Sequence, residues 1–189
     1  MTKVNLSVSE MELVTNASFI LTKNEIIRKV YTLFGNLSAG YIKHLNSINI
    51  QDEIKHLSPR IFKGENYKEL PWVMLDYPRI YDKENICAIR TFFWWGNYCS
   101  INLILKGKYL DKINLDSIDL KGWKIGIDNQ SLWQHDIDTP NFQIANEVSI
   151  DKQGLDFIKL TKKIPLSEWD HIESFMLNNF SVLSEMLKD

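Results

Sequence analysis

The chain has 189 residues, of which 44% are hydrophobic and 24% are charged. These proportions are typical of a globular protein with a sizeable buried core, and we expect one domain spanning residues 1–189. The formal net charge of −2 gives no overall attraction to nucleic acid or to anionic lipid, so neither nucleic acid nor a membrane is expected as a partner.

The N-terminal stretch lacks the features of a secretion signal. It has no continuous apolar run, and Glu10 and Glu12 lie where the apolar core of a signal peptide would have to be. No segment approaches the roughly 20 apolar residues that cross a bilayer. Cys87 and Cys99 are too few for a disulfide framework or a four-cysteine zinc site, so we expect both to be reduced and buried. These features together predict a cytoplasmic protein.

Residues 8–46 are predicted to be helical. Ser7 with Glu10, and Thr22 with Glu25, each match the S-x-x-E capping signature and so mark two helix starts. After the second start, apolar residues recur every three or four positions, which predicts one stripe packed on another element. The members of this stripe are Ile26, Ile27, Val30, Leu33, Phe34, Leu37, Tyr41 and Leu45.

Residues 60–166 are predicted to form a sheet, because short runs rich in β-branched and aromatic residues alternate with Gly, Pro, Asn and Asp. Two of the connections are too short for a parallel crossover, which favours an antiparallel meander of about five to seven strands. The expected strands are Arg60–Asn66, Trp72–Tyr77, Ile86–Trp95, Cys99–Lys106, Trp123–Asp128, Leu132–Asp136 and Phe157–Leu166.

The remaining segments complete the predicted fold. Residues 108–121 are expected to form a short helix or loop, and residues 139–154 show only weak periodicity. Ser167 and Asp170 open a final helix over about residues 167–187, which again has one apolar stripe. The sequence therefore predicts an α+β fold in which the N-terminal helices and the C-terminal helix pack on one face of the sheet.

The stretch "IRTFFWWGNYCSINLIL" predicts a hairpin. Gly96-Asn97 lies between two apolar runs at the spacing of a two-residue loop, so Trp95 is expected to face Tyr98. Side chains alternate between the faces of a sheet, which predicts an apolar face interrupted by Arg90 and an opposite face that mixes aromatic and small polar groups. The expected apolar face holds Ala88, Arg90, Phe92, Trp94, Cys99, Ile101, Leu103 and Leu105; the mixed face holds Ile89, Thr91, Phe93, Trp95, Tyr98, Ser100, Asn102 and Ile104.

Arg90 cannot lose its proton, so burial requires an anion or a set of carbonyl groups beside it. Asp76 is the expected partner, because a turn near Asp82 would place it diagonal to or directly opposite Arg90 on the same face. One interpretation is a structural ion pair under the helices, with a small net effect on stability. The other is an anion site anchored by Arg90 and Arg79, with Tyr77 and the tryptophans as walls.

The motifs of nucleotide-binding loops, zinc proteases and serine esterases are absent from the sequence. His135, Asp136 and Asp138 are close in sequence, but strand alternation would point His135 and Asp136 to opposite faces, which argues against a metal site. No metal and no cofactor are therefore expected.

The missing motifs and the mixed face favour a non-catalytic binding or protein-interaction domain, whose partner is an unknown protein or a small anionic ligand. The alternative is an enzyme of unfamiliar type that acts on a small anionic substrate held by Arg90 or Arg79, with Asp76, Tyr77 or His135 as the acid-base group. A homodimer closed through the aromatic face is a third interpretation. The candidate ligand-binding residues are Arg90, Asp76, Tyr77, Arg79, Trp94 and Trp95.

Overall fold

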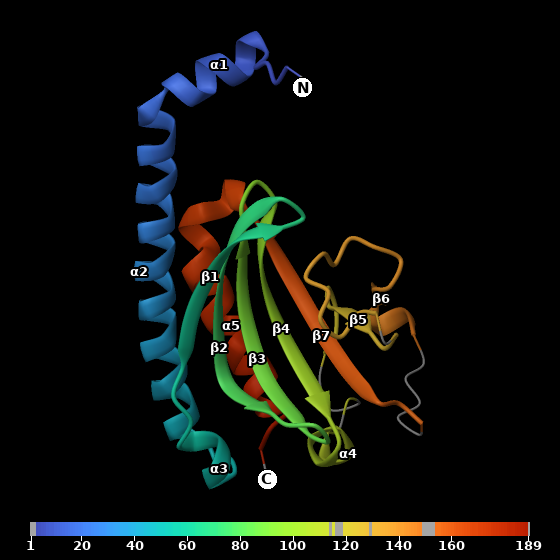
Figure 1. Cartoon of the computed structure of the whole chain (residues 1–189). Coiled ribbons are helices and arrows are strands. Elements are labelled where there is room, and N and C mark those ends of the chain that lie inside the picture. Colours follow the sequence, from blue (N-terminus) through green and yellow to red (C-terminus); the bar gives the residue numbers. More distant parts are fainter. Residues whose placement is uncertain (1–2, 114, 116–118, 129, 149–153, 189) are drawn as a thin grey trace.

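The computed structural model describes residues 3–113, 115, 119–128, 130–148 and 154–188, and its architecture is α+β as the sequence predicts (Figure 1). Residues 149–153, which belong to the stretch of weak periodicity, lie outside the described residues. The helices are α1 (Val8–Thr15), α2 (Ala17–Ser47), α3 (Asp52–Lys55), α4 (Lys108–Lys112), the short 3-10 helices η2 (Ala145–Glu147) and η3 (Leu166–His171), and α5 (Ile172–Glu185). The strands are β1 (Arg60–Tyr67), β2 (Leu70–Tyr81), β3 (Ile86–Trp94), β4 (Tyr98–Lys106), β5 (Lys124–Gly126), β6 (Gln143–Ile144) and β7 (Phe157–Pro165).

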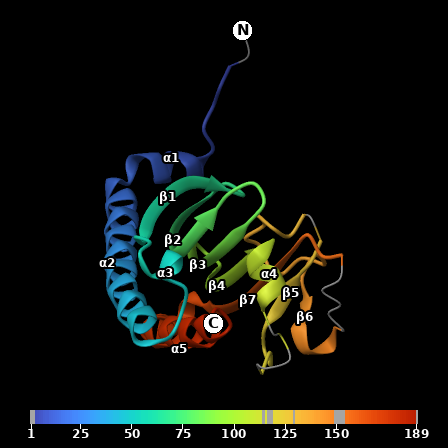
Figure 2. The same cartoon turned by 90° about the horizontal axis from the view of Figure 1, so that it is seen from below.

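The seven strands form one antiparallel sheet in the order β1-β2-β3-β4-β7-β5-β6. The predicted meander is present from β1 to β4, after which β7 pairs with β4 and the short strands β5 and β6 extend the far edge. Helices α2 and α5 pack on each other and cover the same face of the sheet (Figure 2). In the part of the chain that the structure describes, no helix is both long and apolar enough to cross a lipid bilayer.

The apolar stripe of α2 forms one side of the main core. Val30, Phe34, Leu37 and Leu45 are completely buried against the sheet and α5. The ring of Tyr41 stacks on Phe180 of α5 with ring centroids 3.7 Å apart. The removal of this apolar surface from water is what holds the helices on the sheet.

One of the two predicted helix starts is confirmed and the other is wrong. The Ser7 side chain accepts a hydrogen bond from the Glu10 backbone, and the Glu10 side chain accepts one from Ser7 N–H, so the capping box of α1 is present. Thr22 lies inside α2, which begins at Ala17 because the Asn16 side chain already caps it by accepting from Phe19 N–H. The N-cap of α2 is therefore Asn16, six residues before the predicted cap at Thr22.

The predicted register of the β3–β4 hairpin is wrong by one residue. Three residues, rather than two, separate the strands, and Arg90 is paired with Asn102 instead of Leu103. A slip of one residue moves every side chain of one strand to the other face. The face toward the helices consequently holds Ile89, Thr91 and Phe93 with the alternate β4 residues from Cys99 to Leu105. Arg90 shares the opposite face with Ser100, Asn102 and Ile104.

The mixed aromatic-polar surface predicted for a partner is not a free surface. All nine residues of β3 are buried, and in β4 only Lys106 is not. The helices cover one face, and an irregular segment over residues 132–137 covers part of the other. A homodimer closed through this face stays a prediction, and β3 and β4 expose little surface for it.

Residues 132–137, here named the cover segment, do not form the predicted strand. The backbone N–H groups of His135 and Asp136 both donate to the Tyr67 hydroxyl, at 2.9 and 2.8 Å. The Tyr98 hydroxyl donates to the His135 carbonyl and accepts from Ile137 N–H. Side chains of the sheet thus satisfy backbone groups that a neighbouring strand would otherwise pair.

Candidate functional site

A row of polar residues crosses the sheet on the face away from the helices. Directly paired residues of adjacent strands share a face, and the pairs Arg60–Asp76, Asp76–Arg90 and Arg90–Asn102 run from β1 to β4. Thr161 of β7 continues the row and donates to the Asn102 side chain at 2.8 Å. Polar groups that are buried in the middle of a sheet need hydrogen-bond partners. The neighbouring members of this row provide these partners for one another.

The expected ion pair between Asp76 and Arg90 is present, with the two residues directly opposite each other. Arg90 Nε and Nη2 donate to the two oxygens of Asp76, each at 2.8 Å. Arg90 is 7% exposed and Asp76 is 2% exposed. Burial alone would lower the pKa of Arg90, but its hydrogen bonds and its attraction to Asp76 raise it. The pair is therefore a fixed, bidentate unit.

A β-bulge brings Arg79 to the same face. The pairing of β2 with β3 shifts between Asp76 and Arg79. Arg79 is three positions after Asp76, yet it lies opposite Ala88, which is only two positions before Arg90. Pro78 lies inside this irregularity, where a residue without a backbone N–H can be accommodated. Without the extra residue, Arg79 would point toward the helices.

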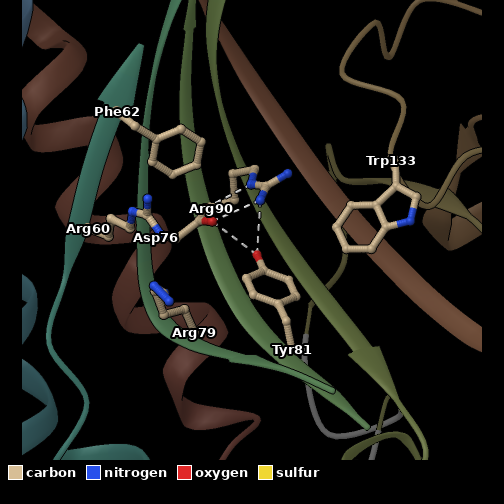
Figure 3. A pocket seen from close by; sticks show the side chains of 7 residues that line it. All are labelled: Arg60, Phe62, Asp76, Arg79, Tyr81, Arg90 and Trp133. Atoms are coloured by element: carbon tan, nitrogen blue, oxygen red, sulfur yellow. Dashed lines mark hydrogen bonds and ion pairs between the residues drawn. The ribbon is translucent and has the colours of Figure 1, made fainter. Parts of the chain in front are cut away.

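These side chains surround an open pocket of about 230 Å³. Figure 3 shows Arg60 and Arg79 on one side, the Asp76–Arg90 pair at the centre and Trp133 on the other side. The full lining is Arg60, Phe62, Asp76, Arg79, Tyr81, Arg90 and Trp133. Three of the seven lining residues are aromatic and four are charged. Small-ligand sites commonly combine aromatic walls with a few placed polar groups.

The charge of the pocket is unbalanced. Three of the four arginines in the chain line it, whereas its one carboxylate, Asp76, is already bound by Arg90. Within the described residues, no carboxylate lies within ion-pair distance of Arg60 or Arg79. The Arg60 guanidinium instead lies 5.6 Å from the centre of the Phe62 ring. The pocket carries a formal charge of about +2 and has donors available for an anion.

Trp133 is held over the pocket by the cover segment. The Arg90 guanidinium carbon lies 5.8 Å from the Trp133 ring centre and equally far from that of Tyr81. The Lys159 ammonium group of β7 donates to the carbonyls of Leu132 and Gln134, at 3.4 and 2.5 Å. These two residues flank Trp133 in the sequence. The position of this wall therefore depends on side chains of the sheet rather than on local secondary structure.

Two further titratable groups are buried under the cover segment. Burial, and secondarily the charge of Arg90, lower the pKa of Lys159 to about 7. Burial, with the charges of Lys159 and Arg90, lowers the pKa of His135 to about 2. The His135 ring stacks on Phe92 at 4.3 Å, and its Nδ1 has no hydrogen-bond partner among the residues that the structure describes. Both groups support the cover segment, and neither lines the pocket.

Only half of the predicted site residues come together. Arg90, Asp76 and Arg79 line the pocket, but Tyr77 lies on the helix face, where its ring is 6.5 Å from that of Phe180. Trp94 packs against Tyr67 and Tyr98 beside the pocket, and Trp95 packs toward the main core.

Sequence reasoning did not assign Arg60, Phe62, Tyr81 or Trp133 to the site. One signal for Arg60 was present, because arginine is rare in this lysine-rich chain and three of its four occurrences fall within residues 60–90. Phe62 and Tyr81 share strands with arginines of the site. Nothing local marks Trp133, which is brought in by contacts with distant strands.

Of the three groups suggested for proton transfer, Asp76 lines the pocket, whereas Tyr77 and His135 do not. Both oxygens of Asp76 accept from Arg90, and Tyr77 points to the other face. Burial raises the pKa of the Tyr81 hydroxyl, which donates to Asp76 at 3.2 Å. Among the described residues, no three His, Cys, Asp or Glu side chains are arranged to hold a metal ion. The pocket thus presents guanidinium donors, while its one carboxylate is already held by an arginine.

Comparison with models of known protein families, with curated proteins and with solved structures finds no match to this chain.

Proposed function

We propose that this protein is a non-catalytic binding domain whose pocket at Arg60, Arg79 and Arg90 holds a small ligand with an anionic end and a flat, apolar body. The observation that carries the proposal is the convergence of three of the four arginines on one pocket with a single, already paired carboxylate. Arginine presents a planar fork of donors that matches carboxylate and phosphate groups, which a lysine does not.

The shape of the pocket supports a small ligand rather than a protein partner. Its volume of about 230 Å³ lies below the roughly 300 to 1,000 Å³ of pockets for drug-sized ligands, which favours a ligand of about one ring with a charged substituent. Phe62, Tyr81 and Trp133 provide aromatic walls for such a ring, while Arg60 and Arg79 lie at the side where the charge would sit (Figure 3). Arg90 is held by Asp76, so the net positive charge of the pocket comes from Arg60 and Arg79, while the fixed pair forms its centre.

The cytoplasmic location expected from the sequence belongs to the same proposal. The thiols of Cys87 and Cys99 are both free and buried, which is common in a reducing compartment.

Titration with four matched compounds tests the proposal. Thermal unfolding of the full chain is followed with inorganic phosphate, phenyl phosphate, benzoate and the neutral analogue benzamide. A ligand that binds only the folded state stabilises it by about 2.7 kcal/mol at one hundred times its dissociation constant. Phenyl phosphate and benzoate should raise the midpoint temperature, phosphate should do so more weakly, and benzamide should have no effect.

The variants Arg79→Gln and Arg60→Gln remove the free guanidinium groups without leaving a buried carboxylate unpaired. Each should fold normally and lose the response to phenyl phosphate. Arg28→Gln is the matched control, because Arg28 is the remaining arginine and pairs on the surface with Glu25. An equal response in all three variants, or equal stabilisation by benzamide and benzoate, would show that the pocket is not an anion site.

A further inference from the structure

We infer that the N-terminal arm, defined as residues 3–21, is the interface through which two copies of this chain associate. This surface is separate from the arginine pocket and shares no residue with it. Figure 1 shows the arm projecting beyond the end of the sheet, with α1 turned away from the axis of α2.

The arm exposes an unusual amount of apolar surface. Every residue of α1 is exposed, and the large apolar side chains exposed along the arm are Val4, Leu6, Val8, Met11, Leu13, Val14, Phe19, Ile20 and Leu21. Together they expose on the order of 1,000 Å², whereas a stable interface of standard size buries about 800 Å² on each partner. Contiguous apolar patches larger than a few hundred Å² on a soluble protein mark interaction sites.

The face of α2 that is buried farther along becomes uncovered within the arm. Ile20 lies seven residues before Ile27, which in turn lies seven before Phe34, so the three share one side of the helix. Ile27 and Phe34 are buried, but Ile20 is 50% exposed and the adjacent Phe19 is 49% exposed. The helix therefore continues its packing surface past the point where its own sheet ends.

The arm has both a groove and a ridge. Leu6, Leu13, Val14, Ala17 and Ile20 line an open groove of about 460 Å³ in the elbow between the helices. Val8 and Met11, here named the ridge, do not line this groove, and they lie about 140° and 160° around α1 from Leu13, because successive residues turn by about 100° around a helix. A helix that is apolar on both sides is typical of one that is buried on both sides.

This combination favours a second copy as the occupant. The ridge of one chain can enter the groove of the other while the reverse contact forms about the same two-fold axis, as in an isologous dimer. A lipid surface is a poorer occupant, since Lys3 is the arm's one basic residue and Glu10 lines the groove. Helices that lie on membranes carry several basic residues instead.

The test measures the mass of the full chain in solution between about 1 and 100 µM by sedimentation equilibrium, a range that brackets common dimer affinities. A concentration-dependent monomer–dimer equilibrium is expected. The ridge variant Met11→Glu and the groove variant Leu13→Glu should each weaken the dimer at least tenfold. The control Ile42→Glu, at an exposed position on α2 outside the arm, should leave it unchanged. Circular dichroism checks that each variant keeps its helices.

Mixing the two variants tests the reciprocal geometry. A mixed pair retains one complete contact, because the intact groove of Met11→Glu can receive the intact ridge of Leu13→Glu. Native mass spectrometry with one variant labelled with ¹⁵N should show the mixed dimer in excess over both homodimers. A monomer at all concentrations, a dimer insensitive to Met11→Glu and Leu13→Glu, or a mixture without mixed dimer would overturn the inference.

Discussion

The buried pair of Asp76 and Arg90 permits a quantitative test of the sheet geometry. Arg90→Met removes both 2.8 Å hydrogen bonds and leaves the 2%-exposed carboxylate of Asp76 with the Tyr81 hydroxyl as its one remaining side-chain donor among the described residues. Breaking one side of a buried ion pair costs about 3 to 5 kcal/mol, because the other charge stays in a poorly solvating environment. We expect the free energy of unfolding to fall by that amount.

The companion variants separate the pair from the packing around it. Asp76→Leu should also destabilise the protein, because it leaves a buried guanidinium unpaired. The double variant Asp76→Leu/Arg90→Met replaces the pair with apolar groups, and such replacements are often close to neutral. The double variant should therefore be more stable than either single variant, which corresponds to a coupling energy of several kcal/mol.

Urea unfolding followed by far-ultraviolet circular dichroism measures all four proteins. The midpoints should shift while the slopes with denaturant stay similar, because the surface exposed on unfolding is nearly unchanged. A loss below about 1 kcal/mol for Arg90→Met would contradict the burial described here. Additive losses in the double variant would show that the two side chains do not act as a pair.

Three further predictions concern the cover segment and the backbone turns. Folding lowers the pKa of Lys159 to about 7 from an ordinary value of 10.5, so between these pH values the unfolded chain binds a proton that the folded chain does not. The free energy of unfolding, relative to that of Lys159→Met, should therefore fall as the pH drops from 10.5 to 7, by at most about 1.4 kcal/mol per pH unit, and stay level below pH 7. Urea titrations across this range measure the difference, and a constant difference would contradict the prediction. Tyr67→Phe leaves the backbone N–H groups of His135 and Asp136 without their acceptor, so the free energy of unfolding should fall by about 1 to 3 kcal/mol. Hydrogen exchange in the cover segment should become faster. Unchanged exchange would show that the Tyr67 hydroxyl does not hold this segment. Gly107→Ala places a side chain on a residue whose φ is 59° and against the Glu84 carbonyl. The control Gly96→Ala has a φ of 72° but open surroundings, and it should lose roughly 1 to 2 kcal/mol of stability. Thermal unfolding should show a larger loss of stability for Gly107→Ala, and equal losses would argue against the close contact.

The parts of the fold that depend on local patterns could be predicted from the sequence. The stripe of α2 and the strand runs are set by hydrophobic periodicity, which acts within a few residues. The Asp76–Arg90 pair could also be predicted, because a short hairpin joins the strands and two charges in apolar runs have few other partners. The side chains of β4 point to the opposite faces from those predicted, because the hairpin loop has three residues instead of two. The Gly96-Asn97 pair does not fix the length of that loop.

Half of the candidate site could be recognised in the same way and half could not. Arg79 reaches the pocket only because the bulge at Pro78 rotates it to the face of Asp76, and proline offered a local hint of that irregularity. Residues 132–137 have the composition of a strand, yet their backbone groups bind the side chains of Tyr67, Tyr98 and Lys159. These partners are more than twenty residues away, so no local rule could connect them.

The sequence by itself determined most of the helices and strands, although not the structure of residues 132–137, and it placed a permanent charge inside an apolar strand where that charge needed a partner. The tertiary structure decided which face that charge occupies, which arginines join it and what covers them. The physical reason is the distance along the chain over which each effect acts. Backbone propensity and hydrophobic periodicity act between near neighbours in the sequence. The pocket and its wall depend instead on register, a bulge and hydrogen bonds between residues that only folding brings together.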